Sequence, residues 1–316
     1  MKVLVTSRSF GNAGNEAFEI LNQAGIEYTL MGSDYSDEKF EAVIADYDAL
    51  IIGAHQFKPE DIRRCDKLKI VCKHGAGLDN IPLEVMKEQG ITVTNVPAMN
   101  ANAVADLTMG HILNVCRGIS YTDALVRKGV WKIFIGRDAY NKTLGLVGFG
   151  AIAKNVARRA KGFSMKVLAY DPFVKEVPEE IKDFVTLVDF ETMVKNSDFI
   201  SIHVPLTKDT KDLFNKETIL KMKKDAYLIN MGRGGIINEK DLYEVMKDGH
   251  LMGAALDVIE KEPMSTEDPL LTLDNFVITP HIGMYSKESV GSVSIVCAEN
   301  VVSKLCGIGE LKFVIQ

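Results

Sequence analysis

The chain has 316 residues, of which 47% are hydrophobic and 25% charged, and its formal net charge is −6. That length exceeds one ordinary core and suits two globular domains. Mixed charges without a basic stripe argue against nucleic-acid or acidic-membrane partners. No apolar run reaches the roughly 18–20 residues that span a bilayer, and the first ten residues resemble a buried strand rather than a signal peptide. The five cysteines show no CxxC pair or metal-ligand spacing. We therefore expect a cytoplasmic protein with reduced thiols, no membrane contact and no metal.

In the first third of the chain, short apolar runs alternate with segments of helical period, which is typical of βα units and a parallel sheet. The expected strands cover residues 2–6, 27–30, 49–52, 70–73 and 91–95. Helices are expected between them, for example at 15–24 and 59–65. A long helix follows at 102–119, where Val104, Leu107, Ile112 and Val115 have the spacing of one buried face.

A second series of the same kind begins near residue 143. Its expected strands cover 144–147, 166–170, 199–203, 226–230, 253–257 and 276–278. Its expected helices include 152–162, 216–222 and 239–247, and a last helix covers 287–306. The pattern predicts an α/β protein with two doubly wound parallel sheets, the second of which carries a nucleotide site.

A glycine-rich turn joins the first strand of this second series to its first helix, with Gly148, Gly150 and Ala153 in a GxGxxA pattern. The first glycine permits a tight turn and the second lets a pyrophosphate approach the backbone. The small third residue lets helix and strand pack closely, and the helix N-terminus attracts the anion. The pattern is weak by itself, because a plain βα turn can also contain it.

The next strand ends in Asp171, 18 residues beyond Ala153, where an acid can accept both ribose hydroxyls of an adenosine. The same acid would repel a 2′-phosphate, and residues 172–174 contain no arginine. We therefore expect NAD rather than NADP as the cofactor.

Three polar residues follow successive strands of the second series: Arg233, Glu262 and His281. The carboxyl ends of parallel strands face the ligand crevice, so these side chains can converge. Histidine exchanges protons near neutral pH and suits the proton transfer that accompanies hydride transfer from an alcohol. A carboxylate would fix its ring, and arginine offers a planar fork to a substrate carboxylate. Singly, each could be a structural residue; together, after a nucleotide fingerprint, they indicate a catalytic trio.

At this point the chain resembles the D-2-hydroxyacid dehydrogenase family, in its phosphoglycerate dehydrogenase-like branch. Segments similar to those of the family occur in order from about residue 70: GAGLDNI at 75–81, NVP at 95–97 with Asn100, VAD at 104–106, GLVGFGAIA at 145–153, HVPLT at 203–207, NMGRGG at 230–235, ALDV at 255–258 and TPHIG at 279–283. The resemblance implies that Arg233, Glu262 and His281 are catalytic, with His281 as acid and base and Glu262 as its partner.

The resemblance also implies the binding residues. The NAD contacts are Gly148, Gly150, Ala151, Ile152, Asp171, Val204, Met231, Arg233, Asp257, His281 and Gly283, with Asp257 toward the nicotinamide amide. A small 2-hydroxy or 2-oxo acid would lie against Ala76, Gly77, Asn100, Arg233 and His281.

Family topology implies a Rossmann NAD-binding domain at 99–286, inserted into a flavodoxin-like substrate domain formed by 1–98 and 287–316. A homodimer is also expected from the helix at 102–119 and the apolar segment that follows it, because this region of the cofactor domain forms the two-fold interface in relatives. The apolar segment 125–134, which includes Trp131, would contribute to it, unless these residues are only intradomain core.

The sequence departs from the family pattern at the loop 53–56, Gly-Ala-His-Gln, which has no arginine where 3-phosphoglycerate enzymes hold the phosphate. A phosphorylated substrate is therefore doubtful, and the group attached to the 2-carbon stays open. Arg8 and His55 are hypothesised to contact that group, although each could equally serve only its own loop. Met99, Ala103 and Asp106 also depart from the family pattern, near the expected hinge helix.

Two other functions share this fold. An NAD(H)-sensing binding protein or corepressor would not need a proton-transfer pair, so the intact trio weighs against it. A formate dehydrogenase has glutamine where this chain has Glu262, which speaks against that activity.

Overall fold

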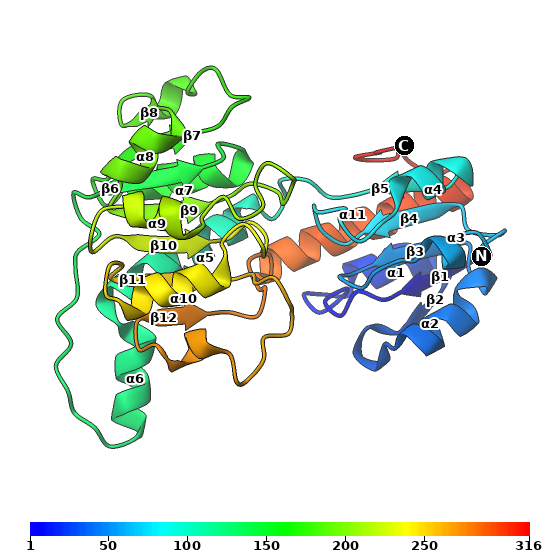
Figure 1. The fold of residues 1–316 in the computed structure, drawn as a ribbon. Helices are drawn as coiled ribbons and strands as arrows, with labels where there is room; N and C mark the ends of the chain where they lie inside the picture. Colours follow the sequence, from blue (N-terminus) through cyan, green and yellow to red (C-terminus); the bar gives the residue numbers. More distant parts are fainter. The chain divides into compact units, whose positions relative to one another are not determined.

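The computed structural model describes residues 1–316, apart from the side chain of Ser33. The chain forms two compact units (Figure 1). Unit 1 comprises Met1–Ala103 and Met284–Gln316, and unit 2 comprises Val104–Gly283. Each unit contains one parallel sheet, of five and seven strands respectively, so the predicted fold class is confirmed.

The sheet of unit 1 has the strand order β2-β1-β3-β4-β5, and all its pairs are parallel. This is the order of flavodoxin-like folds. The third strand in sequence, Ala-Leu-Ile-Ile, is buried throughout, as a central parallel strand covered on both faces must be. The strands are β1 (Lys2–Val5), β2 (Glu27–Leu30), β3 (Ala49–Ile52), β4 (Ile70–Lys73) and β5 (Thr92–Thr94).

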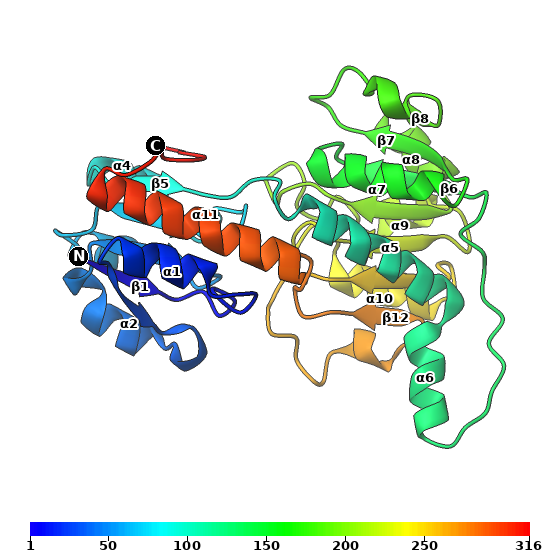
Figure 2. The ribbon, with the colours of Figure 1, turned by 180° about the vertical axis from the view of Figure 1, so that it is seen from behind.

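Helices cover both faces of this sheet. One face packs against α1 (Glu16–Gln23) and α11 (Lys287–Cys306), which lie side by side (Figure 2). The other face packs against α2 (Asp37–Val43), α3 (Pro59–Ile62) and α4 (Leu83–Glu88). The last helix of the chain therefore completes the core of the N-terminal unit.

Helix α11 also has the length and apolar content of a membrane span, which the sequence analysis did not anticipate. Length and composition are weak indications, because core helices of soluble domains satisfy the same criterion. In the most apolar 18-residue window of α11, 56% of the residues are buried inside the structure. Val293, Cys297 and Val301 recur at helical spacing within the same core cluster as β1 and β3. We therefore assign α11 to the core of unit 1.

The sheet of unit 2 has the strand order β12-β11-β10-β9-β6-β7-β8, again entirely parallel. Chain order reverses between β6 and β9, which makes the gap between them the topological switch point where ligands bind in such sheets. The strands are β6 (Thr143–Val147), β7 (Lys166–Tyr170), β8 (Val185–Leu187), β9 (Phe199–Ile202), β10 (Tyr227–Asn230), β11 (Gly253–Leu256) and β12 (Phe276–Ile278). The sequence analysis did not identify β8, a three-residue edge strand in which only Val185 is buried.

One face of this second sheet is covered by α7 (Ala151–Lys161) and by α5 (Ala101–Arg117). The other is covered by α8 (Phe190–Asn196), α9 (Lys216–Lys221) and α10 (Glu239–Lys247). The helix expected at 102–119 ends at Arg117, because Gly118 has a φ of 61°. A further helix, α6 (Ile119–Arg127), extends beyond the sheet, and the chain returns to β6 as an extended segment (Figure 1).

Candidate active site

The turn between β6 and α7 has the geometry that its glycines predict. Gly148 has a φ of +85°, and a Cβ there would lie 2.7 Å from Val204 Cγ1 and 2.9 Å from the His203 carbonyl oxygen. Neither the conformation nor the space admits a side chain. At Gly150, by contrast, nothing lies within 4 Å of where a Cβ would be, so the backbone is open to a ligand.

The N-terminus of α7 begins directly after this open glycine. Gly150 is its N-cap, and no side chain caps the helix. The first-turn N–H groups, including those of Ala151 and Ile152, point toward the helix start, where the helix dipole favours an anion. An uncapped helix N-terminus beside an open glycine fits the pyrophosphate of a dinucleotide.

Asp171 lies at the end of β7, next to the glycine turn. Its Oδ2 accepts a hydrogen bond from the Phe149 backbone N–H at 2.8 Å, and its Oδ1 accepts one from the Phe173 N–H at 2.9 Å. These two bonds fix the carboxylate across the turn. Each oxygen keeps a further lone pair that can accept a hydrogen bond from a ribose hydroxyl.

His281 and Glu262 form a hydrogen-bonded pair. His281 Nδ1 lies 2.9 Å from Glu262 Oε2, and their side chains are 46% and 41% exposed. Burial alone would raise the pKa of Glu262, but the hydrogen bond and charge of His281 outweigh it. The backbone N–H of Ile259 and the charge of Arg233 act in the same direction, so the pKa of Glu262 lies below its ordinary value. The structure thus brings together the three residues that the sequence singled out.

The loop that carries Arg233 is organised by Asn230, a buried residue at the end of β10. The Asn230 side chain donates to the Arg233 carbonyl oxygen at 2.9 Å and accepts from the Gly232 N–H at 3.0 Å. Arg233 Nη1 donates to the Gly232 carbonyl oxygen at 2.8 Å. The sequence analysis assigned Asn230 no site role; its one signal is a polar residue that ends an apolar strand.

A second carboxylate, Glu239 on the first turn of α10, holds the loop that carries Glu262. Its Oε1 accepts a hydrogen bond from the Glu260 N–H at 2.6 Å. Burial raises the pKa of Glu239, and the carboxylates of Glu260, Asp268 and Glu262 add to that effect. This residue was also absent from the sequence-based site.

Asp257 directly follows β11 and is 3% exposed. Its Oδ1 accepts hydrogen bonds from the Thr279 hydroxyl at 2.5 Å and the Ile282 N–H at 2.9 Å, and its Oδ2 accepts one from the Gly283 N–H at 2.8 Å. The carboxylate therefore holds the loop that bears His281. Its expected contact with the nicotinamide amide remains a prediction.

The other expected cofactor residues lie at neighbouring strand ends of unit 2. Val204 follows β9 and packs against Gly148, as noted above. Met231 follows β10 and is buried, with its Cε 3.7 Å from where a Cβ on Gly283 would be. Such a Cβ would also lie 3.1 Å from Asp257 Oδ2, so a side chain at this position would crowd that carboxylate. Their contacts with a cofactor remain predictions.

In unit 1, the candidate substrate loop follows β4. Gly75 has a φ of +146°, and its carbonyl oxygen accepts a hydrogen bond from the Val96 N–H at 2.8 Å. The Ala76 carbonyl oxygen accepts from Asn95 Nδ2 at 2.8 Å. These bonds tie the loop to the segment after β5 and leave the backbone around Ala76 and Gly77 held in one conformation. Asn100, half-buried, immediately precedes α5.

The hypothesis that Arg8 and His55 contact the substrate stays a prediction, and both residues also make contacts within unit 1. Arg8 Nε donates to the Gly32 carbonyl oxygen at 3.2 Å, which ties down its own loop. The His55 ring lies 4.4 Å from the Tyr35 ring and 4.8 Å from the Phe40 ring. Burial, with a contribution from Lys73, lowers the pKa of His55 to about 4, so the ring is neutral near neutral pH.

Lys73 is a cation at the end of β4, directly before the loop at 75–77. Its Nζ donates to the Gly53 carbonyl oxygen at 2.7 Å and to Asn80 Oδ1 at 2.6 Å. It therefore connects the candidate substrate loop to the loop at 53–56, which contains no arginine. Its position as the last residue of a predicted strand was the available signal.

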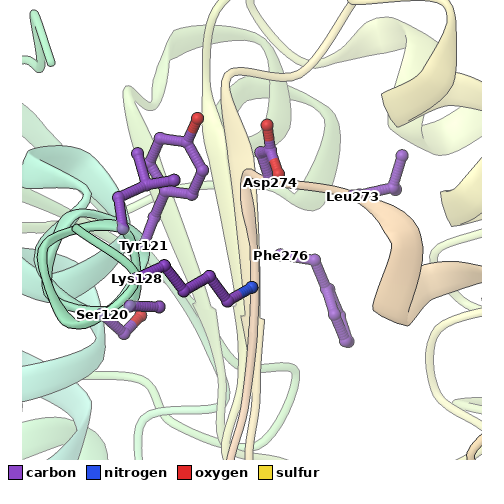
Figure 3. A pocket seen from close by; sticks show the side chains of 8 residues that line it. Ser120, Tyr121, Lys128, Leu273, Asp274 and Phe276 are labelled. Carbon is purple, nitrogen blue, oxygen red and sulfur yellow. The ribbon is translucent and has the colours of Figure 1, made fainter. Parts of the chain in front are cut away.

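A hollow of about 300 Å³ lies elsewhere in unit 2, between α6 and the segment that precedes β12 (Figure 3). It contains none of the candidate site residues. The labelled side chains that line it are Ser120, Tyr121, Lys128, Leu273, Asp274 and Phe276.

Residues 109–283 match the family described as "D-isomer specific 2-hydroxyacid dehydrogenase, NAD binding domain". A D-3-phosphoglycerate dehydrogenase of Methanocaldococcus jannaschii is 39% identical over 312 residues, which cover 97% of this chain and 58% of that protein. A hydroxypyruvate reductase of Thermotoga maritima is 39% identical over 291 residues, 90% of this chain and 93% of that protein. A protein of Thermus thermophilus has a crystal structure with a TM-score of 0.92 and 33% identity, covering both chains fully.

The chain therefore belongs to the D-2-hydroxyacid dehydrogenase family, and the resemblance noted in its sequence is confirmed. It spans 58% of the length of the D-3-phosphoglycerate dehydrogenase that it matches. Unit 2 contains the residues that match the NAD-binding domain.

Proposed function

We propose that this protein is an NAD-dependent oxidoreductase that transfers a hydride between nicotinamide and the 2-carbon of a small 2-hydroxy or 2-oxo acid. The 2.9 Å pair of His281 and Glu262, with Arg233 acting on the same carboxylate, carries the proposal. These residues follow β12, β11 and β10, at the same sheet edge as the glycine turn after β6. A proton-transfer pair beside a dinucleotide turn is the combination that dehydrogenation of an alcohol requires.

The bound nicotinamide supplies the hydride or accepts it. Because Nδ1 of His281 is engaged by Glu262, Nε2 is the atom that takes the hydroxyl proton in oxidation and returns it in reduction. Glu262 fixes the ring and stabilises the imidazolium that forms. Arg233 binds the substrate carboxylate and polarises the carbonyl oxygen. In unit 1, we propose that the Ala76–Gly77 backbone and Asn100 also bind the substrate, as the family resemblance implies.

In this proposal, residues 1–98 and 287–316 bind the substrate and residues 99–286 bind NAD. Gly148, Gly150, Ala151 and Ile152 hold the pyrophosphate, and Asp171 holds the adenosine ribose. Val204, Met231, Asp257 and Gly283 border the nicotinamide half. We also place Lys73 beside the group attached to the 2-carbon, because it is the strand-end cation next to the loop at 75–77.

A reductase screen tests the proposal. Purified protein is mixed with NADH and a panel of 2-oxo acids, including glyoxylate, hydroxypyruvate, pyruvate and 3-phosphohydroxypyruvate, and the absorbance of NADH is followed. We expect turnover of at least one acid, and loss of turnover in His281→Ala. Binding of NADH without turnover of any acid would favour the NAD(H)-sensing alternative and contradict an enzyme.

We also propose that the protein forms a homodimer through the segment 130–135. Trp131, Ile133 and Ile135 in it are 89%, 85% and 85% exposed, whereas residues of a simple intradomain core would be buried. Phe134 folds back onto α6, where its ring lies 6.0 Å from that of Tyr121. A second copy of this chain is the proposed occupant, because most soluble oligomers are two-fold dimers.

The mass in solution tests the dimer. Light scattering at micromolar concentration should give twice the chain mass of 34.9 kDa. Trp131→Asp should shift it toward the monomer. Ile308→Asp, at a 61% exposed site in unit 1, serves as the control and should leave the mass unchanged. A monomeric wild-type protein would end the dimer proposal.

We further propose a cytoplasmic location, in keeping with the free cysteines.

A further inference from the structure

A buried histidine that the proposed chemistry does not use lies beneath the loop of His281. His111, on α5, is 2% exposed, and its Nε2 lies 3.0 Å from Thr279 Oγ1. Thr279 Oγ1 in turn lies 2.5 Å from Asp257 Oδ1. A continuous chain of polar atoms therefore runs from helix α5 to the carboxylate that holds the catalytic loop, entirely within unit 2.

The direction of each hydrogen bond in this chain follows from the groups involved. The Asp257 carboxylate accepts from the backbone N–H groups of Ile282 and Gly283, so it acts as an acceptor at both oxygens. The Thr279 hydroxyl has a single proton, which it donates to Asp257. Its oxygen can then only accept from His111, which must carry its proton on Nε2. Burial, opposed by the charge of Asp257, lowers the pKa of His111 and keeps the ring neutral.

The loop at 279–283 depends on this arrangement. His281 has a φ of 53°, a left-handed conformation that is unfavourable for a residue with a side chain unless its surroundings hold it. Its N–H donates to the Asp257 carbonyl oxygen at 2.9 Å, while the Asp257 carboxylate holds the two residues that follow. Any rotation of the Asp257 side chain would therefore release the backbone that follows the catalytic histidine.

We propose that His111 is a positioning residue for the reaction: by donating to Thr279, it fixes the direction of the Thr279 hydroxyl and, through Asp257, the conformation of the loop that presents His281. The kinetic consequence rests on the proposed function, whereas the effect on the loop does not.

The kinetic test compares variants at His111. His111→Leu removes the donor and should lower kcat about 3–10-fold, the range for one lost neutral hydrogen bond, with the Kd for NADH changed less than about twofold. His111→Gln, whose amide N–H can donate, should recover most of kcat. If His111 acts through Thr279, His111→Leu should lower kcat much less in a Thr279→Val background. Equal losses in both backgrounds, or no recovery in His111→Gln, would overturn the proposal.

Hydrogen exchange provides a readout that is independent of turnover. The amides of Ile282 and Gly283 should exchange faster in His111→Leu than in the wild type, and at near wild-type rates in His111→Gln. Unchanged exchange in His111→Leu would also overturn the proposal. A wild-type protein that turns over no 2-oxo acid, but shows the expected exchange pattern, would contradict the proposed function and still support the role of His111 in holding the loop at 279–283.

Discussion

The two sheets use the polar residues at their strand ends in different ways, and the histidines show the difference best. In unit 1, His74 follows β4 and is buried between Ser7, at 3.1 Å from Nδ1, and Ser294, at 2.9 Å from Nε2. Burial, with a contribution from Lys73, lowers its pKa to about 4. In unit 2, His281 also follows a strand but is 46% exposed and paired with Glu262.

Residue type and a position at the end of a strand therefore do not by themselves identify a catalytic histidine. A histidine enclosed by serines stays neutral and stabilises a loop, whereas an exposed one with a carboxylate partner can gain and lose a proton. By the same criterion His55, which is enclosed by aromatic rings, belongs with His74. Lys73 is the strand-end cation beside the candidate substrate loop of unit 1.

Replacing the exposed histidine is the strongest test of this distinction between enclosed and exposed histidines. His281→Ala should lower kcat by roughly 10²–10⁴-fold, the range for loss of a general acid–base, with NADH binding largely retained. Steady-state kinetics and NADH fluorescence titration measure the two quantities. The matched control is His74→Asn, which should leave kcat within a few-fold wherever the variant folds. An active His281→Ala enzyme would contradict the assignment.

Removing the strand-end acid of the nucleotide site should change the cofactor preference. Wild-type protein should use NADH far better than NADPH, because in the proposed binding mode the Asp171 carboxylate would face a 2′-phosphate. Asp171→Ala should raise KM for NADH about 10–100-fold, the range for lost hydrogen bonds to a charged group, and narrow the gap. Values of kcat/KM for both cofactors measure the effect, and equal values in the wild type would refute it.

In unit 1, the corresponding test replaces the strand-end cation Lys73. Lys73→Met should raise KM for a 2-oxo acid with an anionic tail about tenfold, and change KM for pyruvate much less. Lys73→Arg, which keeps the positive charge, is the control and should retain most of the discrimination. A uniform loss for both substrates, with a lower melting temperature, would instead give Lys73 a structural role.

A further effect concerns the enclosed histidines and the pH dependence of stability. The pKa of His74 is lowered to about 4 and that of His203, at the end of β9, to about 3, both chiefly by burial. Below the ordinary value of 6.5, the unfolded chain therefore binds protons that the folded protein does not. The free energy of unfolding should fall by about 1.4 kcal/mol per histidine for each pH unit between the ordinary and the lowered pKa. Denaturant titrations of wild type and His74→Asn measure the slope, which the substitution should reduce by that amount.

Glu262 follows the same rule as the enclosed histidines, because its pKa is also lowered in the folded protein. Its lowered pKa means that its contribution to stability is present above the ordinary value of 4.5 and is lost as the pH falls through the folded value. At acid pH, therefore, the stabilisation from the Glu262–His281 pair is lost alongside the stability lost through the enclosed histidines.

Much of the fold could be predicted because its strands are short, mostly apolar runs between helices of clear period, as in β3 and β9. The edge strand β8 could not, because three residues with one buried side chain carry almost no pattern. The helix at 102–119 was extended too far because its apolar spacing continues past Gly118, where the backbone becomes left-handed.

The site divides in the same way. His281, Glu262, Arg233 and Asp171 stand in motifs with a direct chemical reason, and these could be selected from sequence. Asn230, Glu239 and His111 could not, because their roles depend on which backbone N–H or hydroxyl the fold places opposite them. Arg8 was favoured for the substrate site because its charge was visible in the sequence, whereas its bond to the Gly32 carbonyl was not.

Direct observation of hydride transfer tests the central proposal. The protein is incubated with NADH deuterated at the transferring C4 position and the 2-oxo acid that the screen selects, and the product is analysed by NMR. We predict a 2-hydroxy acid with one deuterium at the 2-carbon from wild-type protein, and only trace product from His281→Ala under the same conditions. A product without deuterium at the 2-carbon, or no product from any 2-oxo acid despite NADH binding, would contradict the proposed reaction.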